Sequence, residues 1–216
     1  MRIIASADVH GFLEVYQWLV QCCDDRQVDA LVLAGDLLTF ETEYESIEDG
    51  MRASSNKVAA VLSELSIPVL YIMGNDDVID LQADLPNLIP IHEKAVELRG
   101  FRFVGYAGGP RFLGGPYDRD QARLDDEIAA LKPLLNQQTI LITHYPARGT
   151  LDGESYSGGL ESLRRLIEDS DILAHVHGHV HRTFGRHQRH FNVASAGEKR
   201  CMLIELPSTE HEILYG

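Results

Sequence analysis

The stretch RIIASADVHG, residues 2–11, sets the pattern that decides the fold of this chain. Its apolar run ends at Ala7, and two residues able to bind a metal ion, Asp8 and His10, come directly after it. Four more apolar runs end in the same way: 30–34 before Asp36, 68–73 before Asn75, 139–143 before His144, and 171–177 before His179 and His181. Since ligands bind beyond the carboxyl ends of strands in open sheets, we expect one polar site at one edge of one sheet.

Length and cysteine content fit one cytosolic domain. At 216 residues, the chain is predicted to form a single domain over 1–216, with a core that needs no disulfide or structural metal. Three cysteines without a C-x-x-C spacing, Cys22, Cys23 and Cys201, indicate reduced, buried thiols. The N-terminus runs straight into a strand, so we expect no signal peptide, and no apolar run approaches the roughly 20 residues of a membrane span. We therefore expect a cytoplasmic protein.

The charge of the chain is strongly acidic. The sequence has 19 basic and 33 acidic residues, a formal net charge of −14. Such a surface repels long polyanions, which argues against a partner such as duplex DNA. The acidic run between Phe40 and Gly50 is interpreted as a solvated loop.

Alternating strand and helix patterns predict an α/β fold. Helical spacing of apolar residues indicates helices at 11–26, 51–65, 120–132 and 158–169. A hairpin is expected at 94–98 and 101–106, a Gly/Pro-rich loop at 108–116, and late strands near 181–186, 190–194, 201–206 and 211–214. The hairpins favour a second sheet packed on the first, hence a sandwich over one doubly wound sheet.

The polar residues at the strand ends suit a pair of metal ions. Residues two apart in an extended segment point the same way, which pairs Asp8 with His10 and His179 with His181. Glycines 35, 74 and 178 precede candidate ligands and permit tight backbone turns. Seven mixed nitrogen and oxygen ligands exceed the needs of one ion and fit two that share a carboxylate, from Mn, Fe, Zn or Co. Two such ions about 3.5–4 Å apart would be able to hold a bridging hydroxide for in-line attack on phosphorus.

Each short motif is weak alone, but their joint order is specific. DVHG (8–11), GD (35–36), GND (74–76), His144 and GHVH (178–181) together resemble the motif set of the calcineurin-like metallophosphoesterases, in particular their small Icc-like bacterial and archaeal branch. The resemblance implies a four-layer αββα sandwich, with two mixed β-sheets flanked by helices, and two-metal hydrolysis of phosphoesters. It also implies the ligands: Asp8, His10 and His181 for the first ion, Asn75, His144 and His179 for the second, and Asp36 as the bridge. Mn²⁺ is the ion expected to support activity in vitro.

One position departs from that family. The usual Gly-Asn-His followed by an acid is here Gly74-Asn75-Asp76-Asp77, and the missing His is the one that contacts the phosphate and assists the leaving oxygen. An ionised Asp76 would repel a doubly charged monoester more than a singly charged diester. A protonated Asp76 would be able to donate a hydrogen bond or act as a general acid if the site raises its pKa. In a third interpretation Asp76 points to solvent and the metals act alone.

The function expected from these features is metal-dependent hydrolysis of a small phosphoester, with a phosphodiester preferred over a monoester. The alternatives are a nucleotide or protein phosphomonoesterase, and a catalytically silent scaffold that kept the fold; a DNA nuclease is the weakest candidate. The loops around 38–55, 108–118 and 145–158 are expected to shape the substrate pocket, and the oligomeric state stays open.

Several further residues are candidates for a role near the site. His175 and His177 precede the motif glycine and are interpreted as strand residues outside the ligand set, while His187 and His190 are expected at the surface. Arg111 in the Gly/Pro loop and Arg182 beside His181 are candidates for steering a phosphate.

Overall fold

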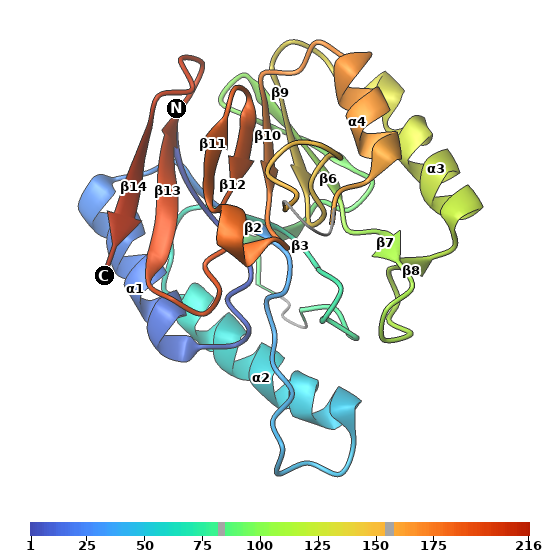
Figure 1. Cartoon of the computed structure of the whole chain (residues 1–216). Helices are drawn as coiled ribbons and strands as arrows, with labels where there is room; N and C mark the ends of the chain where they lie inside the picture. Colours follow the sequence, from blue (N-terminus) through green and yellow to red (C-terminus); the bar gives the residue numbers. More distant parts are fainter. Residues whose placement is uncertain (82–84, 154–157) are drawn as a thin grey trace.

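Within residues 1–81, 85–153 and 158–216, the computed structural model contains two six-stranded sheets (Figure 1). The first is built from β1 (Arg2–Ser6), β2 (Ala30–Ala34), β3 (Val69–Ile72), β4 (Leu88–Pro90), β13 (Arg200–Glu205) and β14 (His211–Tyr215). The second is built from β5 (Ala95–Leu98), β6 (Phe101–Tyr106), β9 (Thr139–Thr143), β10 (Ala174–His177), β11 (Gly185–His187) and β12 (His190–Asn192).

Both sheets are mixed. The first has the order β14-β13-β1-β2-β3-β4, in which β1, β2, β3 and β4 run parallel, β13 pairs antiparallel with β1, and β14 pairs antiparallel with β13. The second has the order β11-β12-β10-β9-β6-β5, with parallel pairs from β12 to β6 and antiparallel pairs at both edges. The mixed sheets expected from the sequence are therefore confirmed.

Helices cover the outer face of each sheet. The helices are α1 (Leu13–Arg26), α2 (Ile47–Leu62), α3 (Gln121–Ala130) and α4 (Glu161–Glu168). In Figure 1, α1 and α2 lie toward the lower left and α3 and α4 toward the upper right, with the strands between them. Along β1 the side chains alternate: Ile4 packs in the cluster under α1 and α2, whereas Ile3 and Ala5 pack between the sheets. The expected four-layer αββα sandwich is thus the observed fold.

Several element boundaries differ from the sequence prediction, and three of the differences change the type of structure. Helix α2 starts at Ile47 because Ser46 accepts a hydrogen bond from the backbone N–H of Asp49, so the end of the acidic run is helix and not loop. The negative charges of Glu48 and Asp49 in its first turn interact favourably with the positive end of the helix dipole. The strand predicted at 181–186 is a 3₁₀ turn, His181–Thr183, followed by β11. The loop predicted at 108–116 contains β7 (Gly109–Pro110), which pairs with β8 (Asp118–Arg119).

The carboxyl ends of parallel strands from both sheets lie at the same end of the sandwich. Strands β1, β2 and β3 supply this end of the first sheet, and β9 and β10 supply that of the second. A bridge between Ala7 and Ala194 and the backbone N–H of Ala7 on the carbonyl of Val193 tie the sheets together there. The expectation of a site at one edge of one sheet is therefore wrong, because two sheets meet at it.

The three cysteines form no disulfide. Cys23 and Cys201 are buried and Cys22 is half-buried. Among the described residues, we find no helix that combines the length and the apolar character needed to cross a bilayer.

Packing between the sheets gives a first prediction. Phe191 on β12 is fully buried among the apolar residues that join the two sheets. We expect Phe191→Ala to lower the free energy of unfolding by about 3–5 kcal/mol, because it leaves a cavity in a close-packed layer. Denaturant unfolding measures this change. Phe112→Ala is the matched control: that ring is 61% exposed, and its loss should change stability by less than about 0.5 kcal/mol.

Candidate metal centre

All seven predicted ligands follow the carboxyl ends of strands, and the strand registers bring those ends level. Ser6 of β1 lies opposite Leu33 of β2, and Ala34 of β2 lies opposite Ile72 of β3. In the second sheet Ile142 of β9 lies opposite Val176 of β10. The ligand residues after these strands are therefore neighbours in space: Asp8, His10, Asp36, Asn75, His144, His179 and His181.

Three overlapping groups of side chains bring ligand atoms together. Asp8, His10 and His181 form the first, Asp8, Asp36 and His144 the second, and His10, Asp36 and Asp76 the third; within each, the ligand atoms lie within 4.8 Å of one another. Asp8 and Asp36 each belong to two groups and are almost completely buried. The geometry therefore provides adjacent sites that share carboxylates.

Four of the seven predicted ligands have a left-handed backbone. The φ angles are 54° at Asp8, 49° at His10, 51° at Asp36 and 68° at His179. This region is uncommon for residues other than glycine, although Asp and His enter it more readily than most. Each such residue costs roughly 1–3 kcal/mol, and residues of this kind cluster at functional sites. Three of the four, Asp8, His10 and Asp36, belong to the ligand groups described above.

Two glycines leave the space in which the carboxylates lie. A Cβ at Gly74 would be 2.1 Å from Oδ1 of Asp36, and a Cβ at Gly178 would be 2.3 Å from Oδ2 of Asp8. Any side chain at these positions would displace a candidate ligand. The glycines noted in the sequence therefore permit close approach to the site.

Asp36 and His144 join the two sheets inside the centre. Nε2 of His144 lies 3.3 Å from Oδ2 of Asp36, and its Nδ1 donates a hydrogen bond to the carbonyl of Ala34 at 2.9 Å. That carbonyl fixes the tautomer and leaves Nε2 facing the site. Burial opposes charge on both groups, but each is the other's counter-ion, so the pKa of Asp36 is lowered and the pKa of His144 is raised.

His179 and His181 differ in their surroundings. Burial lowers the pKa of His179 to about 4, which keeps its ring neutral as a metal ligand must be. Its backbone N–H donates to Asp8 at 3.0 Å, although its ring belongs to none of the three groups above. His181 is partly exposed, and its Nε2 lies 3.1 Å from Oδ1 of Asp8; this hydrogen bond raises its pKa.

Asn75 and Asp76 lie side by side at the end of β3. Oδ1 of Asn75 is 2.9 Å from Nε2 of His144, and Nδ2 of Asn75 donates to Oδ1 of Asp76 at 2.6 Å. The other oxygen of Asp76 lies 3.7 Å from Nδ1 of His10, so the carboxylate faces the centre. Burial and the neighbouring Asp36 raise the pKa of Asp76.

Asp77 has a structural role that the sequence did not reveal. The side chain is buried and accepts hydrogen bonds from the backbone N–H groups of Gly74, Leu37 and Leu38 at 2.8–3.1 Å. It thereby ties the turn after β2 to the turn after β3. The signal available in the sequence was an acid two residues after Asn75, which gives no indication of its direction.

A second group of histidines lies on strands β10 and β12 of the second sheet. His175 and His177 are buried on β10 and outside the three ligand groups. His190, expected at the surface, is also buried, because it sits opposite His175 in the sheet and their Nδ1 atoms are 3.0 Å apart. The surface prediction for His190 is therefore wrong: its place was set by strand pairing and not by the nearby turn. His187 is exposed as expected.

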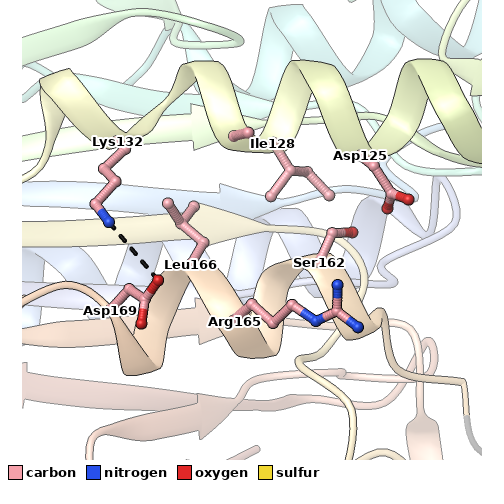
Figure 2. Close-up of a pocket in the computed structure, with 8 residues that line it drawn as sticks. Asp125, Ile128, Lys132, Ser162, Arg165, Leu166 and Asp169 are labelled. Carbon is pink, nitrogen blue, oxygen red and sulfur yellow. Dashed lines mark ion pairs between the residues drawn. The ribbon is translucent and has the colours of Figure 1, made fainter.

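Two cavities have different relations to the centre. One of about 310 Å³ lies between α3 and α4, where Figure 2 shows Ile128 and Leu166 flanked by charged groups. Its Lys132 pairs with Asp169 at 3.7 Å, and no candidate ligand lines it. The other, of about 390 Å³, reaches His179 and includes Arg111 and Arg148. It lies between the predicted pocket loops 108–118 and 145–158, although residues 154–157 are outside the described part of the chain.

The residues of the centre fit transition-metal ions. Imidazole nitrogens, carboxylates and one amide oxygen make a mixed donor set that suits Mn, Fe, Zn or Co better than Ca or Mg. The space left by Gly74 and Gly178 and the left-handed backbone of four candidate ligands are consistent with a role in holding such ions. The donor set is compatible with each of these four metals.

Comparisons with known proteins agree with this geometry. The model of the calcineurin-like phosphoesterase family matches residues 1–183. Similar solved structures include TT1561 of Thermus thermophilus, 17% identical with a TM-score of 0.74, over 99% of this chain and 98% of that chain. A dimetal phosphatase from Danio rerio is 12% identical with a TM-score of 0.63, over 100% of this chain and 98% of that chain. At these identities the likeness shows the fold alone, and comparison with curated protein sequences gives no match.

The burial of Asp77 generates a stability prediction. Asp77→Ala removes the acceptor of three buried N–H groups, so we expect a loss of about 3–5 kcal/mol in the free energy of unfolding. Denaturant unfolding in the presence of EDTA measures it without a contribution from bound metal. The control is Asp126→Ala on the exposed side of α3, expected within about 0.5 kcal/mol of the parent. Equal stability of the two variants would contradict the structural role of Asp77.

Proposed function

Since this chain belongs to the calcineurin-like phosphoesterase family, we propose that it hydrolyses phosphodiesters with the help of two metal ions. The observation that carries the proposal is the set of overlapping ligand groups that share Asp8 and Asp36. A carboxylate with two oxygens is able to bind two adjacent ions at once, and two-metal sites hold their ions about 3.5–4 Å apart. Hydrolysis adds water across one P–O bond and yields a phosphomonoester and an alcohol.

In this proposal the two ions have separate ligands and one common ligand. Asp8, His10 and His181 hold the first ion, and Asp36 is shared. Asn75, His144 and His179 hold the second. When bound, such ions would supply a water activated for attack and would neutralise the non-bridging phosphate oxygens. The carbonyl of Ala34 keeps Nε2 of His144 directed at the second ion.

Asp76 is proposed to set the preference for diesters. Its carboxylate faces the centre near His10, where the relatives of this family usually have an imidazole. Two divalent ions would bring four positive charges against the three negative charges of Asp8, Asp36 and Asp76. An ionised Asp76 therefore lowers the net positive charge of the centre by one, which favours a singly charged diester over a doubly charged monoester. Removal of the carboxylate would shift the balance toward the monoester.

Metal content tests the first part of the proposal. Asp36 belongs to two ligand groups, so we expect Asp36→Asn to reduce the bound metal by at least one equivalent and hydrolysis by more than about 100-fold. Elemental analysis after loading with Mn²⁺, together with hydrolysis of bis(p-nitrophenyl) phosphate, measures both. Asp126→Asn is the matched control. If the Asp36 variant binds as much Mn²⁺ as the parent protein, the assignment of Asp36 as a shared ligand is wrong.

The role of Asp76 is tested with a pair of variants. We expect Asp76→His to raise kcat/KM for p-nitrophenyl phosphate about tenfold relative to bis(p-nitrophenyl) phosphate, since a repulsive charge near the phosphate is removed. Asp76→Asn removes the charge without adding an imidazole, and thereby separates charge from proton donation. If neither variant gains monoester hydrolysis, Asp76 does not set the preference.

A further inference from the structure

A cavity of about 390 Å³ opens beside the candidate metal centre. It is lined by residues after β7, at the start of α3, after β9 and after β10, among them Arg111, Phe112, Gln121, Tyr145, Arg148 and His179. Its volume falls in the range of roughly 300–1,000 Å³ that small-molecule sites occupy. The cavity is therefore large enough for a substrate group beyond the phosphate.

His179 connects this cavity to the centre. The ring of Tyr145 lies 4.2 Å from the ring of His179, centroid to centroid, and a Cβ at Gly158 would be 3.3 Å from Cδ2 of His179. Tyr145 and Gly158 thus hold the imidazole between the cavity and the second ion of the proposal. A group esterified to a phosphate at the centre would enter the cavity directly past His179.

The cavity offers aromatic surface to such a group. Phe112 is 61% exposed on its loop and lines the cavity. The ring of Tyr145 lies deeper and is almost buried, with Gly109 packed against it. In the described part of the chain, the hydroxyl of Tyr145 has no hydrogen-bond partner. Aromatic walls and a free hydroxyl suit a planar ring with polar edges.

The cavity also offers positive charge. Among the residues that the structure describes, none pairs with the guanidinium of Arg148. Arg111 is 76% exposed and reaches Asp120 only at 3.8 Å. The acid at the cavity wall, Glu161, is already held by Arg164 and Arg165. In a chain with a net charge of −14, two arginines thus line this cavity beside the centre, a favourable setting for a second phosphate.

We propose that this cavity binds one ester arm of the substrate and that this arm carries both an aromatic base and a further phosphate. The substrate class is a nucleotide diester with a terminal phosphate. The base lies against Phe112 and Tyr145, and the terminal phosphate is bound by Arg148 and Arg111. This assignment rests on the proposed function, because it names the substrate of the same centre.

Two dinucleotides that share a scissile bond test the proposal. Thymidylyl-(3′→5′)-thymidine and its 5′-phosphorylated form differ only in the terminal phosphate. With Mn²⁺ and the full chain, we expect the phosphorylated form to have an about tenfold lower KM, the size of effect that one charge-assisted contact supports. Arg148→Gln should reduce this preference below about threefold, and Phe112→Ala should raise the KM of both dinucleotides. Product release is followed chromatographically.

A control variant and two different negative results separate failure of the cavity assignment from failure of the proposed function. Arg99→Gln removes an exposed arginine at the β5–β6 turn, outside the cavity, and should keep the full preference. If bis(p-nitrophenyl) phosphate is hydrolysed but the two dinucleotides have equal KM, or if Arg148→Gln keeps the preference, the cavity assignment is overturned and the proposed function stands. If no diester is hydrolysed, the proposed function and the cavity assignment both fall.

Discussion

The contact between Asp36 and His144 is the interaction on which the centre depends. It lies between the end of β2 in one sheet and the end of β9 in the other, and the carbonyl of Ala34 holds the same imidazole from its opposite side. Neither sheet alone could assemble the ligand set, because its members follow β1, β2 and β3 of the first sheet and β9 and β10 of the second. The packing of the two sheets therefore fixes the spacing of the ligands.

The centre concentrates features that oppose folding. Buried carboxylates approach one another, and four ligand residues adopt a strained backbone. Without a bound metal ion, the protonated His144 offsets the charge of Asp36, as the lowered pKa of Asp36 and the raised pKa of His144 indicate. A cation that replaces that proton would neutralise more than one carboxylate at once. Ions that bind the folded state alone would therefore stabilise the fold as well as supply chemistry.

The sequence predicted most of the strands and the polar residues that follow them, because both are local signals. An apolar run predicts a buried strand, and the polar residue after it, at Asp8, Asp36 or His144, marks the strand's end. The features that the sequence did not predict depend on contacts between segments that are distant along the chain. The burial of His190 follows from its register opposite His175, and the position of Tyr145 against His179 follows from the packing of two loops. No local pattern carries that information.

Asp76 and Asp77 are adjacent acids with different roles in the turn after β3. Both oxygens of Asp77 are engaged by backbone N–H groups of two turns, so this acid does not contact the side chain before it. Asp76 is instead oriented by Asn75, and its backbone N–H donates to Asp36 whatever its side chain is. A substitution at position 76 therefore alters the charge that faces the candidate metal centre and leaves the turn intact. The same substitution at position 77 would open the turn itself, since three buried donors would lose their acceptor. Position 76 can consequently change its charge without loss of the turn, as the diester preference proposed for Asp76 requires, and position 77 cannot.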